Sequence, residues 1–194
     1  RAGAPPTQRG RPAPPPPLPP QDPAVTLSVI VPVYNGEATI GPCLDSILQQ
    51  DTGCTVQLIV VDSDSTDGTA AVLERYRALP GVVLCNCSAP RSAAAARNEG
   101  LRHAVGRWLM FVDSDDLLLP GAIRTLLDAA QRLDADVVQG GWQYLYTDGT
   151  HGPVQCYPAA VYTGAAAPER FELPGMPWGK IYRRGAFSPG AGPL

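Results

Sequence analysis

The feature that most constrains the fold is a regular alternation of strand-like and helix-like segments, which begins at Leu27. The strand-like segments are short apolar runs, the first of them rich in Val and Ile, which is typical of strands buried on both faces. They cover residues 27–34, 56–62, 82–87 and 108–113. A helical pattern follows each of them, at residues 37–50, 65–79, 92–105 and 120–133. This alternation predicts an α/β fold with a mostly parallel sheet and helices on both faces.

The rest of the chain falls into an arm before this pattern and a less regular part after it. Residues 1–24 contain ten of the 22 prolines, which predicts a disordered or polyproline-like arm outside the fold. Such an arm is either an inert linker or a ligand for a proline-reading module. Residues 136–146 and 154–158, on either side of a TDGT turn, predict a less regular pair of strands. The expected folded domain is therefore 25–194.

Composition excludes several classes of protein. The chain has 194 residues, 44% of them apolar, which is enough for one domain with its own core. The net charge of −3 argues against a protein that coats nucleic acid or an anionic membrane. No apolar run approaches the roughly 18 residues of a transmembrane helix. The five cysteines form no CxxC pair and are odd in number, so neither a zinc site nor a disulfide framework is indicated.

Polar clusters follow three of the predicted strands. They are PVYNGE at residues 32–37, VDSDSTDGT at residues 61–69 and VDSDD at residues 112–116. The carboxyl ends of parallel strands meet at one edge of a sheet, and ligands of α/β proteins bind there. The glycine motifs GxxxxGK[ST] and GxGxxG, which commonly hold phosphate, do not occur at the places where they would be expected. We therefore expect a site at this edge that uses other groups.

Three carboxylates, Asp113, Asp115 and Asp116, lie within four residues of one another. Like charges packed together repel each other unless a cation neutralises them. Carboxylate oxygens suit Mg²⁺ or Mn²⁺, and Asp113 and Asp115 can both reach into one crevice as the strand loosens into a loop. A metal there would neutralise charge on a departing phosphate. The alternative is a solvated turn in which Asp116 caps a helix.

Four segments carry a family resemblance through their order and spacing. They are SVIVPVYNGEATIGPCLDSILQQ, VVDSDSTDGT, SAAAARNEGL and FVDSDDLLLPGAI. Together they resemble the family 2 glycosyltransferases of GT-A fold, over residues 27–135 without a break. The segment WGKIYRRGAF at residues 178–187 is similar to a WxKxY segment of the capsule and exopolysaccharide members. The resemblance implies a metal-dependent enzyme that moves a sugar from a nucleotide-diphosphosugar to a hydroxyl of a glycan or lipid-linked sugar, with inversion at the anomeric carbon.

The resemblance also implies roles for particular side chains. Those expected at the base and ribose are Pro32, Tyr34, Asn35 and Asp62. Asp115 is the expected metal ligand, Asp113 contacts ribose or metal, and Arg97 offers a planar fork to phosphate or ribose. Each has a structural alternative: Tyr34 as a packed strand-end aromatic, Asn35 as a turn residue, and Arg97 in an ion pair with a strand-end aspartate. Arg91 is a further candidate for phosphate, and Trp178 and Lys180 are candidates for the acceptor or diphosphate side.

The cluster after the second strand departs from the commoner DDGSTD form. Ser63 stands where uridine-using members have an acid that accepts from the base. A preference for uridine is therefore not expected, and thymidine and guanosine stay open. We interpret Ser65, Thr66 and Asp67 as helix-capping residues with a structural role.

Inversion requires a general base on the acceptor side. In similar exopolysaccharide enzymes it is an acidic residue some way after the WxKxY segment, and none follows Phe187 here. The expected base therefore lies beyond residue 194, and the chain is expected to be C-terminally truncated. In this interpretation residues 27–135 bind the sugar donor and residues 136–194 form an incomplete acceptor part. Glu169 and Glu172 are the candidates inside the chain.

Two other functions stay open. The first is a nucleotide-sugar-binding module without transfer activity. The second is a phosphatase-like phosphotransferase, which also uses a DxD after an apolar strand; Leu117 stands where such enzymes have Thr or Val. The expected location is the cytoplasm, with a peripheral position at the inner face of the membrane as the alternative.

Overall fold

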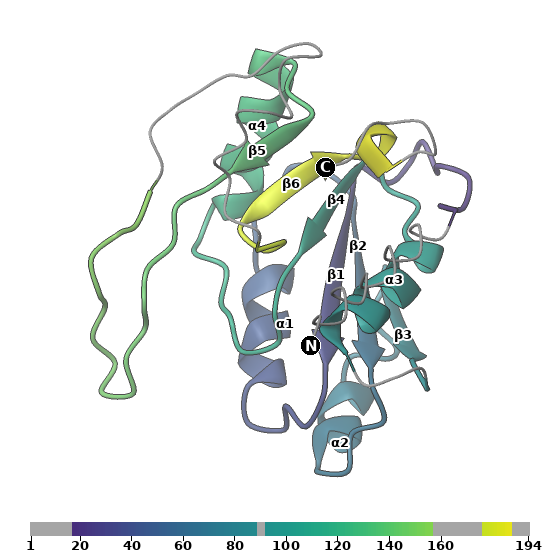
Figure 1. The fold of residues 1–194 in the computed structure, drawn as a ribbon, viewed down its shortest axis with the longest axis vertical. Helices are drawn as coiled ribbons and strands as arrows, with labels where there is room; N and C mark the ends of the chain where they lie inside the picture. Colours follow the sequence, from purple (N-terminus) through teal and green to yellow (C-terminus); the bar gives the residue numbers. More distant parts are fainter. Residues whose placement is uncertain (1–16, 89–91, 157–175, 188–194) are drawn as a thin grey trace, which may run out of the picture.

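The computed structural model describes residues 17–88, 92–156 and 176–187. Within these residues the chain forms a six-stranded sheet in the order β3-β2-β1-β4-β6-β5 (Figure 1). The strands are β1 (Leu27–Val33), β2 (Val56–Asp62), β3 (Val82–Asn86), β4 (Trp108–Phe111), β5 (Val137–Gln139) and β6 (Lys180–Arg183). The first four are parallel to one another, whereas β6 is antiparallel to both β4 and β5.

Helices cover both faces of this sheet. They are α1 (Ile40–Leu48), α2 (Thr69–Glu74), α3 (Ala93–His103) and α4 (Ala122–Leu133), followed late in the chain by the 3-10 helix η2 (Arg184–Phe187). Helices α1, α2 and α4 share one hydrophobic cluster with the sheet, and α3 contributes to a second cluster on the opposite face. The described residues therefore form three layers, which confirms the predicted α/β architecture.

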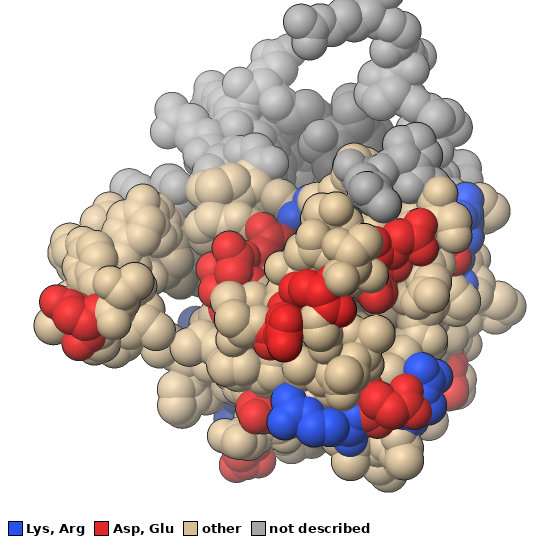
Figure 2. All heavy atoms as spheres, turned by 90° about the horizontal axis from the view of Figure 1, so that it is seen from below, with Lys and Arg blue, Asp and Glu red and all other residues tan. Residues whose placement is uncertain are grey.

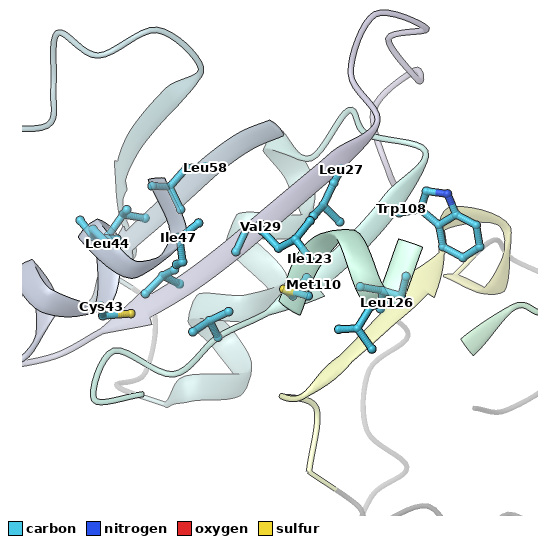
Figure 3. Close-up of a cluster of buried hydrophobic side chains, with 14 of the residues drawn as sticks. Leu27, Val29, Cys43, Leu44, Ile47, Leu58, Trp108, Met110, Ile123 and Leu126 are labelled. Carbon is cyan, nitrogen blue, oxygen red and sulfur yellow. The ribbon is translucent and has the colours of Figure 1, made fainter. Parts of the chain in front are cut away.

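Strand β1 lies at the centre of both clusters. All seven of its residues are buried, because their side chains alternate between two covered faces. Leu27 and Val29 point into the cluster covered by α1 and α4, together with Leu44 and Ile123 (Figure 3). Ile30 points to the other cluster, where α3 packs. The continuous apolar pattern of residues 27–34 thus corresponds to a strand with no exposed face.

The structure differs from the sequence-based prediction at the edge of the sheet formed by β6 and β5. Of the described residues of the predicted strand pair, which exclude 157 and 158, only Val137–Gln139 joins the sheet. Residues 142–155 instead form a hairpin outside it, closed by the bridges Trp142↔Gln155 and Leu145↔His151. Strand β6, which was not predicted, lies between β4 and β5. Its four residues are too few to show a strand pattern, and its partners β4 and β5 lie far away along the chain.

The proline-rich arm meets the domain before its expected boundary at residue 24. Leu18 packs against the cluster on the α3 side. The Asp22 N–H donates to the Val105 carbonyl at 2.9 Å, and the Pro19 carbonyl accepts from the Arg184 guanidinium. Residues 17–24 are therefore attached to the domain, and residues 1–16 lie outside the described residues.

The structure also bears on the expectations about cysteines and membrane-spanning helices. All five cysteines are unpaired thiols. Within the described ranges, no helix is at once long and apolar enough to cross a membrane.

Helix α3 packs very closely on the sheet at Gly100. A Cβ built at this position would lie 2.4 Å from Cγ2 of Ile30, which is fully buried in β1. Ala96, one turn earlier, is also fully buried. Small residues at these two positions allow the helix to approach the strand, and this approach sets the position of Arg97.

We expect Gly100→Ala to destabilise the protein by about 1–3 kcal/mol, because the added methyl group overpacks the core beside a side chain that cannot move aside. The better helix propensity of alanine returns at most about 1 kcal/mol of this loss. Urea denaturation measures the change. The control is Asn98→Ala, an exposed position of the same helix, which should leave stability unchanged or slightly higher. Equal midpoints for both variants would contradict the close approach.

Candidate functional site

A cavity of about 290 Å³ lies at the carboxyl ends of the parallel strands. Its walls come from the loops after β1, β2 and β4 and from the start of α3. The lining residues are Pro32, Val33, Tyr34, Ser63, Ser92, Ala93, Arg97, Asp113, Ser114 and Asp115. Acidic side chains gather on this face of the molecule (Figure 2). The structure therefore brings together five of the predicted residues, Pro32, Tyr34, Arg97, Asp113 and Asp115.

The two other predicted residues, Asn35 and Asp62, do not line the cavity. The Asn35 side-chain oxygen accepts from the Thr66 N–H at 2.8 Å. The Asp62 carboxylate accepts from the N–H and hydroxyl of Ser65, at 3.1 and 2.6 Å. Both side chains therefore hold the loop that follows β2, and their predicted contacts with the base or ribose stay untested predictions.

These bonds belong to a larger clamp between residues 35–37 and 65–69, which we call the loop clamp. Its members are polar side chains of one loop that accept hydrogen bonds from main-chain N–H groups of the other loop. The bonds run from Asn35 N to Ser65 Oγ (2.9 Å), from Gly36 N to Thr69 Oγ1 (2.9 Å), from Glu37 N to Asp67 Oδ2 (3.1 Å) and from Gly68 N to Glu37 Oε2 (3.0 Å). The clamp fixes the two loops that carry Tyr34 and Ser63.

The loop clamp refines the capping interpretation of Ser65, Thr66 and Asp67. Helix α2 begins at Thr69, with Gly68 as the N-cap residue. Asp67 accepts from the Thr69 N–H at 3.0 Å, so it supports the first turn, whereas Ser65 and Thr66 bond to Asn35. The structural role is confirmed, but most of it consists of joining two loops.

Two residues of these loops have left-handed backbone conformations. Asn35 has a φ of 50° and Asp64 a φ of 57°. Asn and Asp are the non-glycine residues that adopt this conformation most readily. Each allows the chain to turn sharply after its strand, so the lining residues Tyr34 and Ser63 stay at the strand ends.

The cavity has an aromatic side and a side rich in hydrogen-bonding groups. Tyr34 is 46% exposed at the mouth, so its ring can be reached by a ligand. The lining also includes Ser92, the N-cap residue of α3, whose hydroxyl accepts from the Ala95 N–H at 3.1 Å. The first turn of a helix presents main-chain N–H groups and the positive end of the helix dipole, which favours anions. The N-cap pattern of Ser92 was visible in the sequence, but its place in the cavity was not.

Arg97 forms an ion pair with Asp113 inside the cavity, which confirms the structural alternative expected for this arginine. Only 17% of the Arg97 side chain and 29% of the Asp113 side chain are exposed. Pairs that are shielded from water interact more strongly than surface pairs. Arg97 and Asp113 both line the cavity, so the ion pair forms part of its wall. Arg91 lies outside the described residues.

The carboxylates after β4 are not fully neutralised by Arg97. Partial burial and the charges of Asp115 and Asp113 raise the pKa of Asp116 to about 6. The same negative field acts on Cys43, whose thiol donates to the Asp113 carbonyl at 3.5 Å. Burial, together with Asp116, Asp115 and Asp113, raises the pKa of this thiol to about 12. The cluster therefore has the excess negative charge that a cation would relieve.

The carboxylates do not form a complete metal cage. Across the described part of the chain, no three His, Cys, Asp or Glu side chains are arranged to hold a metal ion. Ions such as Mg²⁺ often take only one or two carboxylates from the protein and complete their shell with water and phosphate oxygens. Asp113 and Asp115 fit this kind of site, in which a ligand supplies further oxygens.

Trp178 and Lys180 lie at the same edge of the sheet but outside the cavity lining. Trp178 forms a bridge with Phe111, the last residue of β4. Lys180 is buried, its amine donates to the Met176 carbonyl, and burial lowers its pKa. Lys180 thus holds the turn that carries Trp178. Glu169 and Glu172, the candidate bases, lie outside the described residues.

The sheet with its cavity at the strand ends is the GT-A fold of glycosyltransferases, as two solved structures show. TarS of S. aureus is 30% identical to this chain, with a TM-score of 0.55, over 59% of this chain and 35% of that one. The mannosyltransferase PcManGT of Pyrobaculum calidifontis, in complex with GDP-Man and Mn²⁺, is 29% identical, with a TM-score of 0.54, over 63% of this chain and 37% of that one.

The chain belongs to Glycosyl transferase family 2, because the profile of that family matches residues 28–187. Among curated relatives, the glycosyltransferase GlyA of Streptococcus pneumoniae is 30% identical over 83% of this chain and 25% of its own length. The chain thus spans about a quarter to two fifths of the proteins named here. Family membership also leaves no support for the phosphatase-like alternative.

The loop clamp can be tested at Thr69, which is fully buried and accepts from the Gly36 N–H. We expect Thr69→Val to lower the free energy of unfolding by about 1–3 kcal/mol, because the Gly36 N–H loses its partner. Thermal or urea denaturation measures this change. The control is Thr66→Val at an exposed residue of the same loop, which keeps the main-chain bond to Asn35, loses only a long 3.4 Å hydroxyl contact and should stay within about 0.5 kcal/mol of wild type. A neutral Thr69→Val would show that the clamp adds nothing to stability.

Proposed function

We propose that this chain binds a nucleotide-diphosphosugar together with Mg²⁺ or Mn²⁺ and transfers the sugar, with inversion, to a hydroxyl of a glycan or lipid-linked acceptor. The observation that carries the proposal is the cavity that brings Tyr34, Arg97, Asp113 and Asp115 together. Further support comes from a structure of TarS in complex with UDP-GlcNAc and from the GDP-Man complex of PcManGT. Cytoplasmic action, at the inner face of the membrane when the acceptor is lipid-linked, is part of the proposal.

The two sides of the cavity match the two ends of a nucleoside diphosphate. The exposed ring of Tyr34 offers a stacking surface for the base, and Pro32 and Ser63 lie beside it in the lining. Arg97 and the first turn of α3 offer positive groups for the diphosphate. In this proposal Asp113 accepts from a ribose hydroxyl or shares the metal. The choice of base stays a prediction.

Asp115 and Asp113 are the residues that would hold the metal. They are hard oxygen ligands, and their charges, after burial, help to raise the pKa of Asp116. When bound, a divalent ion supplies charge neutralisation for the departing diphosphate. Arg97 adds a second positive group on the same side, so the leaving group would be stabilised without a proton transfer.

The general base for inversion stays unassigned. Both carboxylates in the cavity lining, Asp113 and Asp115, are used on the sugar-donor side in this proposal. Glu169 and Glu172 are acidic candidates within the chain, and the expectation of a base beyond residue 194 stays a prediction. The alternative of a binding module is distinguished by assaying sugar transfer as well as binding.

We expect wild-type protein to bind UDP or GDP only when Mn²⁺ is present. We expect Asp115→Asn to lose this metal-dependent binding. The variant removes one charged ligand while keeping the shape of the side chain. Titration calorimetry with each nucleotide, with and without Mn²⁺, measures the effect. Asp64→Asn is the control, since Asp64 is exposed after β2 and outside the cavity lining. Equal metal-dependent binding by Asp115→Asn would remove this residue from the site.

Arg97→Met should have opposite effects on the two ligands. Removing a positive group from the carboxylates should strengthen the binding of Mn²⁺ alone, because less repulsion acts on the ion. The same change should weaken nucleoside diphosphate binding by about tenfold or more, since a charged hydrogen bond is worth about 1.5–3 kcal/mol. Arg102→Met, on the exposed side of the same helix, is the control. If both ligands weakened equally, Arg97 would have only a structural role.

A further inference from the structure

The hairpin of residues 142–155 projects from the β5 side of the sheet without being part of the sheet. Figure 1 shows this segment as two extended lengths that leave β5 and run toward the end where the parallel strands finish. Main-chain bonds hold it together, from Trp142 N to Gln155 O at 2.8 Å and from Gly152 N to Tyr144 O at 2.8 Å. The hairpin is therefore an ordered projection with two faces.

One face of the hairpin carries a row of aromatic rings. Trp142, Tyr144 and Tyr146 occupy alternate positions of one strand, so their side chains share a face. We call this row the aromatic face. The Trp142 and Tyr144 rings lie edge to face with centroids 5.0 Å apart, and the Tyr144 and Tyr146 rings stack at 6.3 Å. Tyr144 is 58% exposed and Tyr146 is 49% exposed, so most of this row meets solvent.

A glycine on the opposite strand keeps the space between the two tyrosines open. A Cβ at Gly152 would lie 3.2 Å from the Tyr146 hydroxyl and 3.3 Å from the Tyr144 Cβ. Any side chain there would therefore press on both tyrosines. With glycine at this position, no side chain of residue 152 presses between the two tyrosines.

The aromatic face connects to the carboxyl edge of the parallel strands. The Trp142 ring contacts the Trp178 ring edge to face, with centroids 5.8 Å apart. Trp178 in turn pairs with Phe111, two residues before Asp113. A ligand lying along the row would therefore reach from the tip of the hairpin to the sheet edge at which the cavity opens.

The chemistry of the aromatic face favours a neutral ligand with both apolar and hydroxyl groups. Residues 136–156 contain no Lys or Arg. Anionic membranes and nucleic acids are attracted by such cations, so this segment lacks the groups that recruit them. Tyr and Trp combine a flat apolar surface with a polar group at the ring edge. The C–H faces of sugar rings stack on such surfaces, while their hydroxyl groups bond at the edges.

We propose that the aromatic face binds the acceptor as a neutral oligosaccharide laid along the hairpin, with its growing end toward the cavity. This inference rests on the proposed function, because only a glycosyltransferase has an acceptor. It adds to that function a class of acceptor: a glycan several sugars long, which fills the row from Tyr146 to Trp142. A monosaccharide or disaccharide contacts too few of the rings to be held there.

The test uses the whole chain and neutral oligosaccharides as probes, from disaccharide to hexasaccharide, built of β-linked glucose, β-linked N-acetylglucosamine or α-linked mannose. The variants are Tyr144→Ala with Tyr146→Ala, and the conservative pair Tyr144→Phe with Tyr146→Phe. Leu145→Ala is the matched control, because Leu145 is 53% exposed on the opposite face of the same strand. Circular dichroism shows that each variant is folded, and binding of UDP or GDP with Mn²⁺ is measured in parallel.

We expect wild type to bind the hexasaccharide of at least one series about tenfold more tightly than its disaccharide. The alanine pair should lose about tenfold of this affinity, while the phenylalanine pair and Leu145→Ala keep it. Nucleotide binding should be the same in all four proteins. The absence of any length dependence, or full binding by the alanine pair, overturns the inference. So does a finding that the alanine pair instead loses vesicle binding or self-association.

The parallel measurement of UDP or GDP binding with Mn²⁺ separates this inference from the proposed function. If wild type binds no nucleotide with Mn²⁺ but still shows length-dependent sugar binding through Tyr144 and Tyr146, the proposed transfer reaction is wrong and the aromatic face is a glycan-binding surface. If nucleotide binding is intact and sugar binding is absent, the aromatic face has another role and the proposed function stands.

Discussion

A strand that is buried on both faces and paired on both edges can place polar chemistry only at its ends. Strand β1 is in this position, between β2 and β4 in the sheet and between helices above and below. The loops at the carboxyl ends of these parallel strands therefore meet in one small region, and the polar residues of three separate segments are brought together there. The position of the cavity follows from this constraint and not from any single motif.

The same region shows how closely structural and functional roles lie together. The loop clamp satisfies main-chain N–H groups that would otherwise be left without partners at the ends of β1 and β2. It leaves Tyr34 and Ser63 in the cavity lining. Their sequence neighbours Asn35 and Asp62 instead bond to Thr66 and Ser65 of the loop after β2. Arg97 pairs with Asp113 in an acidic cluster, in which burial and the charges of Asp115 and Asp113 raise the pKa of Asp116. The cavity is thus built from groups that also hold it in shape.

Much of the sheet was predictable, because buried parallel strands read as continuous apolar runs and the helices between them are periodic. The edge at which Arg97 and Asp113 meet was predictable from topology. The direction in which Asn35 and Asp62 point was not, since their partners Ser65 and Thr66 come from a segment whose local pattern predicts only a turn and a helix cap. Strand β6 was missed for a similar reason: a short segment with Lys180 and Arg183 at its ends has no strand signature before its neighbours β4 and β5 are in place.

The insertion of β6 between β4 and β5 has a consequence for how the chain folds during synthesis. Among the described residues, β5 pairs in the sheet with β6 alone, and β6 follows it by some forty residues. Strands β1 to β4 and their helices can form as soon as they leave the ribosome, since each pairs with a segment already made. Strand β5, and the hairpin that hangs from it, must wait for a contact of long sequence separation, which forms late and slowly. Among the described residues, strands β1 to β4 with the cavity are therefore assembled before β5, β6 and the hairpin that carries the aromatic face.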